Sequence, residues 1–339
     1  MYSLKTQLHK KQKEYSCGDL RTLSLDVTSL CNMRCTKCYA ETFVQTKPVG
    51  LDILKKAIDD AYHLGVFHYV LQGGEPIADP IRLEAILKMI YPDETYINVV
   101  SNGWKMTIDR IRWLKELKVD KISFSLDSGI EGEHDADRGN GAYSRVLEAI
   151  DNVLAEGLLS SISVVVTHQS LHSAGFRMAY EFAEKKKIRV DVQIAEPVGK
   201  WDGKRELLMT PEDTRHIKEL QKKSPILPNG QRMVSRDIYS IDVDHCPAGG
   251  EFMAIASDGS VLPCNFLQYS LGNIKDRSLA DMRKDLLTSD WFDGKQSLCL
   301  CGEDPAFIEK FIMPYVGHDK PLNAYKVFGL KQGGLDGKI

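Results

Sequence analysis

The sequence predicts an α/β protein in which a partial barrel of six strand–helix units precedes a small C-terminal domain with a β-hairpin. Two observations lead to this prediction. Short apolar runs alternate with helical patterns through the first 200 residues, and polar and glycine residues follow the predicted strands. Right-handed crossovers wind such a series into a parallel sheet or an incomplete barrel. We therefore expect an open (β/α)6 barrel of the TIM type, with its chemistry at the carboxyl ends of the strands.

Six short apolar runs have the length and composition of strands. Several lack clean alternation of polar and apolar residues, as parallel strands covered on both faces do. The six runs are Thr22–Val27, Phe67–Gln72, Tyr96–Ser101, Lys121–Leu126, Ser161–Val166 and Arg189–Ile194. Apolar residues recur at helical spacing between these runs, and a glycine such as Gly65 or Gly157 marks the end of a predicted helix.

The pattern changes after Lys200. A polar stretch from Met209 to Lys223 predicts one amphipathic helix, and apolar runs on both sides of Asp258-Gly259 predict a β-hairpin. These changes divide the chain into five segments. They are an N-terminal extension (1–20), the barrel (21–200), a connector (201–240), a domain rich in cysteine (241–310) and a C-terminal tail (311–339).

Charge and composition exclude several classes of protein. The 339 residues include 44 basic and 47 acidic side chains, and the net charge of -3 provides no positive field for binding nucleic acid. No signal peptide opens the chain, and no stretch approaches the ~18 apolar residues of a membrane span. We therefore expect a cytoplasmic protein. In a reducing compartment, cysteines more often bind metal or react than form disulfides.

Three cysteines follow the first predicted strand in a CxxxCxxC loop. Cys31, Cys35 and Cys38 can supply thiolates to three corners of a cubane iron–sulfur cluster. The fourth iron then stays open to a small ligand, as the vacant position of a catalytic zinc does. A zinc knuckle or coincidence is the alternative interpretation, and it is weakened because the next histidine, His63, lies beyond a predicted helix.

This loop resembles the signature of the radical SAM superfamily, and the resemblance covers most of the chain. It implies a 4Fe–4S cluster that binds S-adenosylmethionine (SAM) at its open iron and cleaves it to methionine and a 5′-deoxyadenosyl radical. That radical removes hydrogen from a substrate, while the protein orients the reactants and excludes side reactions. The chain departs from many members at one point: they carry an aromatic residue just before the last cysteine, where this sequence has Lys37 and then Tyr39.

The resemblance also implies which residues contact SAM. Gly73-Gly74-Glu75-Pro76 resembles the motif that receives the amino group of SAM, although such a sequence is equally typical of a turn. Positions after the third, fourth and sixth strands resemble those near its carboxylate, ribose and adenine, although Asp127 is also a plausible helix cap. The implied cofactor-binding residues are Tyr39, Gly73, Gly74, Glu75, Ser101, Asn102, Ser125, Asp127 and Glu196.

A second group of cysteines lies near the C-terminus. Four thiolates from separated segments can close a coordination shell and stabilise a small domain, and zinc would also accept them. The segment resembles the auxiliary-cluster domain called SPASM, and its truncated form, twitch, fits the number of cysteines better. The implied ligands of this second 4Fe–4S cluster are Cys246, Cys264, Cys299 and Cys301. The short Cys-Leu-Cys spacing leaves open whether both of the last two are ligands, and Cys17 is interpreted as a spare thiol.

Two clusters would allow an oxidation, because a substrate radical formed at the first could lose an electron to the second. The resemblance thus implies an oxidoreductase of a small polyhydroxylated metabolite, reduced by a flavodoxin or ferredoxin. The stretch before Cys31 is too short for a leader-recognition domain, which favours a metabolite over a peptide. Two alternatives stay open: a maturase of a ribosomal peptide or protein, and a non-catalytic, zinc-binding interaction module.

No general base is assigned from the sequence. Polar residues in or after the loops at the strand ends are candidates, but capping and solvation explain most residues of this kind. These candidates are His134, Asp135, Asp137, Arg138, His168, His172 and Lys200.

Overall fold

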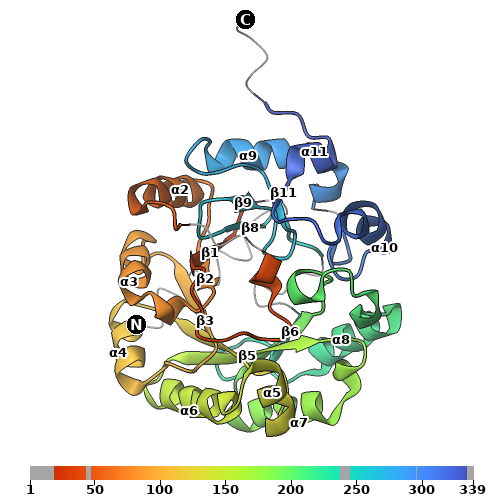
Figure 1. Ribbon diagram of the computed structural model, residues 1–339. Helices are drawn as coiled ribbons and strands as arrows, with labels where there is room; N and C mark the ends of the chain where they lie inside the picture. Colours follow the sequence, from red (N-terminus) through yellow and green to blue (C-terminus); the bar gives the residue numbers. More distant parts are fainter. Residues whose placement is uncertain (1–18, 43–46, 237–244, 295, 334–339) are drawn as a thin grey trace, which may run out of the picture.

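The computed structural model describes residues 19–42, 47–236, 245–294 and 296–333. Most of the predicted N-terminal extension, including Cys17, lies outside these ranges. All six predicted strands are confirmed, and neighbouring strands pair in parallel in sequence order (Figure 1). The strands are β1 (Thr22–Thr28), β2 (His68–Gly73), β3 (Tyr96–Ser101), β4 (Lys121–Ser125), β5 (Leu159–Val166) and β6 (Arg189–Ile194).

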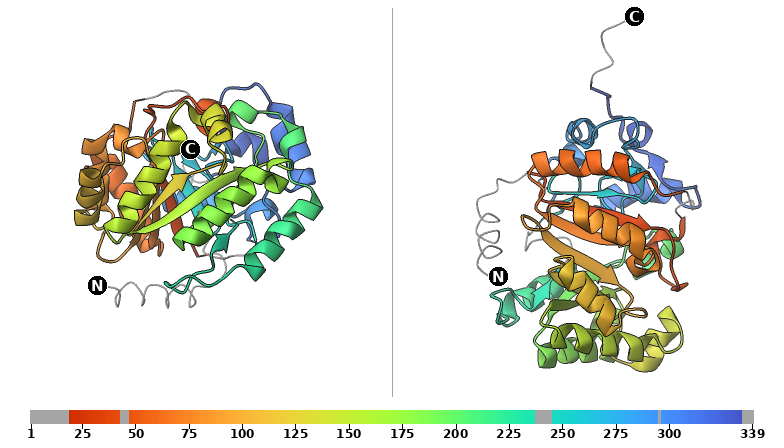
Figure 2. Two further views of the ribbon diagram at one scale, coloured as in Figure 1. Left: turned by 90° about the horizontal axis from the view of Figure 1, so that it is seen from below. Right: turned by 90° about the vertical axis from the view of Figure 1, so that its left-hand side faces the viewer.

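Helices cover the outer face of this sheet (Figures 1 and 2). They are α2 (Leu51–His63), α3 (Pro80–Met89), α4 (Ile108–Glu116), α5 (Glu131–Arg138), α6 (Ala142–Ala155), α7 (Ala174–Lys186) and α8 (Pro211–Lys223). Their buried residues recur at helical spacing, as Val146, Ile150 and Val153 do in α6. Side-chain caps fix several helix starts: Thr210 forms a capping box with Asp213 at the start of α8, the amphipathic helix predicted there.

The sheet continues beyond the six predicted strands on both sides. In the described residues, β7 (Val234–Ser235) joins β6, and β8 (Phe252–Ile255) joins the free edge of β1. β9 (Val261–Leu262) pairs antiparallel with β8, which brings the sheet to nine strands and confirms the predicted hairpin. Its attachment to β1 was not predicted from the sequence. All four residues of β8 are buried, and pairing with β1 satisfies their backbone groups at that depth.

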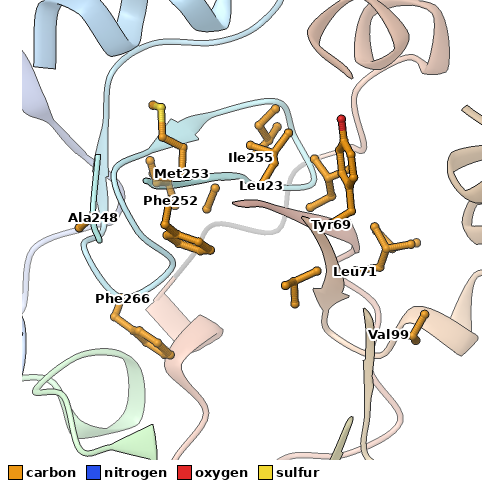
Figure 3. Close-up of a cluster of buried hydrophobic side chains, with 14 of the residues drawn as sticks. Leu23, Tyr69, Leu71, Val99, Ala248, Phe252, Met253, Ile255 and Phe266 are labelled. Carbon is orange, nitrogen blue, oxygen red and sulfur yellow. The ribbon is translucent and has the colours of Figure 1, made fainter. Parts of the chain in front are cut away.

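One apolar cluster joins the barrel to the C-terminal segment. Leu23, Tyr69 and Leu71 from the first two strands belong to the same cluster of buried side chains as Phe252 and Ile255 from β8 (Figure 3). These side chains are at most 2% exposed. The two parts therefore share a core and do not form separately packed bodies.

The segment interpreted as a C-terminal tail is largely folded. β11 pairs in parallel with β10, and Phe328 contacts Tyr269 and Phe292 edge to face. The C-terminal elements are β10 (Tyr269–Ser270), α9 (Leu279–Leu286), α10 (Pro305–Phe307), a π-helix (Ile308–Ile312), β11 (Leu322–Asn323) and α11 (Ala324–Phe328). Isolated aromatic residues form no periodic sequence pattern that would predict structure here. In the structure they pack against one another within the part of the chain described up to residue 333.

Within the described parts of the chain, no helix combines the length and apolar character needed to cross a membrane.

The shared core yields a prediction at Tyr69. Its side chain is fully buried on β2, and its hydroxyl has no hydrogen-bond partner in the described structure. We expect Tyr69→Phe to leave the free energy of unfolding unchanged or to raise it by about 1 kcal/mol, because an unsatisfied buried hydroxyl is removed. Tyr69→Ala should lower it by ~3–5 kcal/mol through lost packing. Anaerobic denaturant unfolding of the two variants measures both values, and equal losses would contradict the prediction.

Candidate functional site

The carboxyl ends of the barrel strands open into a cavity of about 670 Å³. Residues from the barrel and from the C-terminal segment line it together, including Ser257, Asp258 and Phe266 from the latter. Nearly all of the predicted site residues of the barrel meet here. They are Cys31, Cys35, Cys38, Tyr39, Gly73, Gly74, Glu75, Ser101, Asn102, Ser125 and Glu196.

The cysteine loop is packed directly against the glycine-rich turn after β2. The N–H of Gly74 donates to Thr28 O (2.8 Å), and that of Glu75 donates to Leu30 O (2.8 Å). A Cβ atom on Gly74 would lie 2.2 Å from Leu30 O, so only glycine permits this approach. The two motifs that the sequence places far apart are therefore one structural unit.

Glu75 ties this unit to the end of β3. Its buried carboxylate accepts hydrogen bonds from the Ser101 hydroxyl (2.9 Å) and the Asn102 N–H (2.8 Å). Burial raises the pKa of Glu75, and these hydrogen bonds oppose the rise. The Asn102 amide in turn donates to Asn32 Oδ1 (2.9 Å), which lies within the cysteine loop and was not singled out in the sequence.

Asp127 does not line the cavity with the other predicted residues. It is buried behind the wall, where it forms ion pairs with Arg138 and with Lys37 (3.4 Å) and accepts a hydrogen bond from the Val165 N–H (3.1 Å). Burial alone would raise the pKa of Asp127, but the two cations outweigh it and hold that pKa far below its usual range. The structure thus gives Asp127 a role in fixing cations near the cysteine loop.

Lys37 and Arg138 hold the cysteine loop against α5. Lys37 also pairs with Asp137 (2.7 Å), and the Thr36 hydroxyl donates to the same carboxylate (2.7 Å). Arg138 Nη1 lies 4.0 Å from Cys35 Sγ. The residue that occupies the usual aromatic position, Lys37, therefore anchors the loop by charge. A guanidinium beside Cys35 also suits a ligand that must be a thiolate.

Tyr39 and Phe266 connect the first cysteine group to the second. The ring of Tyr39, next to Cys38, contacts that of Phe266 edge to face at 5.2 Å between centroids. The carbonyl of Phe266 accepts a hydrogen bond from the Cys301 thiol (3.4 Å). Only one residue therefore intervenes between Tyr39 and the auxiliary cysteines.

The four C-terminal cysteines are brought together from separate segments. The thiols of Cys246 and Cys299 are hydrogen-bonded to each other, an interaction that raises the pKa of Cys299. Cys301 interacts electrostatically with Cys299 and Cys264, and its own pKa is raised chiefly by burial. All four are free thiols, so the donors fit an iron–sulfur cluster as the sequence predicts.

Glu303 supports this second group from outside it. Its carboxylate accepts the backbone N–H of Cys299 (2.9 Å), pairs with Arg236 and accepts the Thr214 hydroxyl (2.6 Å). Sequence reasoning missed this residue, because its partners come from the connector segment.

Among the described residues, no three His, Cys, Asp or Glu side chains come close enough to hold a single metal ion.

None of the candidate bases from the sequence lines the cavity except Arg138, which is paired with Asp127. His168 and His172 both contact Asp213 at 2.8 Å, and Asp135 accepts the N–H groups of Gly141 and Tyr143 at the start of α6. Asp26 on β1 does line the cavity and was missed. Its only sequence signal is one carboxylate in an otherwise uncharged strand.

Two family models match the chain. Residues 25–175 match the radical SAM superfamily, and residues 246–303 match SPASM, an iron-sulfur cluster-binding domain. The chain is 25% identical over 316 residues to an AdoMet-dependent heme synthase from Methanosarcina barkeri, which covers 82% of this chain and 88% of that protein. It is 24% identical over 266 residues to the antilisterial bacteriocin subtilosin biosynthesis protein AlbA from Bacillus subtilis, covering 74% and 56%.

Solved structures share the fold. SuiB from Streptococcus suis, bound to precursor peptide SuiA, superposes with a TM-score of 0.62 at 16% identity, covering 86% of this chain and 70% of that one. The protein anSMEcpe with bound AdoMet gives a TM-score of 0.58 at 22% identity, covering 81% and 82%.

The ion pairs of Asp127 yield a prediction about the loop. Asp127→Asn leaves Arg138 and Lys37 as uncompensated buried cations, so we expect the free energy of unfolding to fall by ~3–5 kcal/mol. Because the pKa of Asp127 is depressed, this stabilisation is complete above about pH 5 and decreases only as the pH falls below the usual carboxyl pKa of about 4.

Anaerobic urea unfolding at several pH values measures this loss. Asp93→Asn is the control, since Asp93 forms an exposed ion pair with Lys118 and should change the value by less than about 1 kcal/mol. A similar small change in Asp127→Asn would contradict the assigned role.

Proposed function

The chain belongs to the radical SAM superfamily and carries a SPASM iron–sulfur domain, and from this membership we propose that it oxidises its substrate within the cavity at the carboxyl ends of the barrel strands. Its cofactors are a 4Fe–4S cluster and SAM, together with auxiliary iron–sulfur clusters in the SPASM domain. When bound, these groups supply the one-electron steps that side chains cannot perform.

We assign the first cluster to Cys31, Cys35 and Cys38, which leave one corner for SAM. Gly73, Gly74 and Glu75 then receive the methionyl end, because the glycines allow close approach and the carboxylate attracts an ammonium. Ser101, Asn102, Ser125 and Glu196 line the rest of this half of the cavity and are assigned to the carboxylate and nucleoside.

The observation that carries the oxidative assignment is the position of Phe266. It lines the cavity, its ring contacts Tyr39 beside Cys38, and its carbonyl accepts the thiol of Cys301. A substrate in the cavity would therefore lie beside the first cysteine group, with Phe266 between it and Cys301. We assign the auxiliary cluster to Cys246, Cys264, Cys299 and Cys301, placed to accept an electron from the substrate.

We propose a small polyhydroxylated metabolite as the substrate. Besides the residues assigned to SAM, the cavity is lined by further hydrogen-bonding side chains, including Asp26, Gln72, Asp258 and Ser260. Such a lining suits a compact molecule with many hydroxyl or amino groups. We expect a flavodoxin or ferredoxin as the reductant and the cytoplasm as the location.

Peptide modification is the second candidate. The subtilosin protein and the peptide-bound SuiB described above favour it, because both names concern peptides. A dialysable metabolite extract and the peptides retained on dialysis can be incubated separately with the loaded enzyme, SAM and reductant. A dialysable product lighter by two hydrogens supports the metabolite, and a modified retained peptide supports the second candidate.

The cluster assignment predicts loss of SAM cleavage when the first cysteine group is removed. Anaerobically reconstituted wild type should contain about eight irons per chain and release 5′-deoxyadenosine on reduction. Cys31→Ala combined with Cys35→Ala and Cys38→Ala should contain about half of that iron and release none. Release of 5′-deoxyadenosine at the wild-type rate by this triple variant would defeat the assignment.

The electron-acceptor role predicts a different defect for the second group. Cys246→Ala combined with Cys264→Ala should also lose about half of the iron. Substrate oxidation should fall far more than SAM cleavage, so that more 5′-deoxyadenosine is released per product. Chromatography of both products gives this ratio, and an unchanged ratio would remove the role.

A further inference from the structure

Asp26 is a cavity-lining carboxylate that forms no ion pair with any residue the structure describes. It lies on β1 opposite Gln72 of β2, is half-buried, and lines the cavity shortly before the cysteine loop. In the described structure it accepts one long hydrogen bond, from Gln72 Nε2 to Oδ1 (3.3 Å). Its second oxygen, Oδ2, has no partner there and remains available to a molecule in the cavity.

Several other buried carboxylates in the described structure are ion-paired. The ion pairs are Asp127 with Arg138, Asp191 with Arg189, Asp285 with Arg277 and Glu303 with Arg236. Glu75 has no cation but accepts hydrogen bonds from Ser101 and Asn102. Enclosing a carboxylate without such partners is costly, and side chains kept at that cost are concentrated at functional sites.

The surroundings of Asp26 keep it near its protonation midpoint. Burial and the negative charge of Asp258, in the turn between β8 and β9, raise the pKa of Asp26 to about 7, while Gln72 opposes the rise. Gln72 Nε2 also donates to the Tyr39 hydroxyl (2.8 Å), so the Gln72 side chain is hydrogen-bonded to both Asp26 and Tyr39. Asp319 and Lys320 are further charged residues that line the same cavity. A group in this range can accept and release a proton at neutral pH.

We propose that Asp26 is the proton acceptor of the oxidation, and that the substrate carries a hydroxyl or amino group on the carbon that loses hydrogen. The inference rests on the proposed function and adds the residue and the substrate group to it. Asp26 lines the same cavity as Cys31, Cys35 and Cys38, and its strand, β1, pairs with β8, which leads to Asp258 and Cys264.

The step is balanced as follows. The 5′-deoxyadenosyl group from SAM would take a hydrogen atom from the substrate and leave as 5′-deoxyadenosine, so that an unpaired electron stays on a carbon that still bears O–H or N–H. The proton of that group passes to Oδ2 of Asp26, and one electron passes to an iron–sulfur acceptor. The C–O or C–N single bond becomes a double bond, so the substrate loses two hydrogens in all.

Infrared spectroscopy can observe Asp26 directly. In the cluster-loaded protein with SAM, difference spectra between pH values should contain a carboxyl band that titrates near pH 7 and is absent from Asp26→Asn. Asp258→Asn should move the midpoint to lower pH, because it removes a neighbouring negative charge. Asp93→Asn, on the exposed surface, should leave the band unchanged. A midpoint near the ordinary value of about 4 would overturn the proposal.

Turnover provides the second measurement, with the dialysable extract as the probe. Asp26→Asn should form the dehydrogenated product roughly 10²–10⁴-fold more slowly, the usual contribution of a general base. Asp26→Glu, which keeps the carboxylate, should restore part of this loss. The wild-type rate should rise with pH through the midpoint of Asp26, and Asp258→Asn should shift that rise to lower pH. A product rate in Asp26→Asn equal to that of wild type would overturn the proposal.

Different results would contradict the proposed function and the proton-acceptor role of Asp26. If the wild type cleaves no SAM, or oxidises nothing in the extract, the proposed function fails whatever the infrared result. If the wild type oxidises a component of the extract but no titrating band or rate loss belongs to Asp26, only the proton acceptor is wrong.

Discussion

The structure depends on one strand that is paired on both sides. β1 pairs with β2 across one edge and with β8 across the other, so the barrel and the SPASM domain share a sheet and a core. The same strand carries Asp26 and ends in the loop of Cys31. Because both neighbours are fixed by backbone hydrogen bonds, the cavity beside the loop of Cys31 has a defined position relative to the C-terminal cysteines. A flexible linker between the two parts would give no such order.

Much of the fold could be predicted from the sequence, because burial leaves a local pattern. The six barrel strands and the hairpin around Asp258-Gly259 are confirmed. The pairing of Leu23 with Met253 left no local sign, since backbone pairing between distant segments is independent of side-chain identity. The folded C-terminal segment was missed for a related reason: it is held by single aromatic residues such as Phe328, which show no periodicity.

The candidate site likewise contains features that the sequence predicts and features that it does not. Spacing predicted the thiols and the glycine-rich turn, whose chemistry depends on residue type, and the structure brings them together. Charge partners could not be predicted, because they are set by the folded environment. Asp127 has the residue type of a ribose contact, yet Arg138 and Lys37 engage it behind the wall. Asp26 resembles any strand carboxylate in the sequence, and it is distinguished by its place in the cavity and by forming no ion pair within the part of the chain that the structure describes.

The last wall of the cavity comes from the end of the described chain. Asp319, Lys320 and Pro321 line it, and β11 secures them against β10. Both cysteine groups precede these residues in the sequence. A chain interrupted before Asp319 would therefore keep every proposed cluster ligand and still leave the cavity open on one side. Ligand supply and enclosure are thus encoded in separate stretches of the polypeptide.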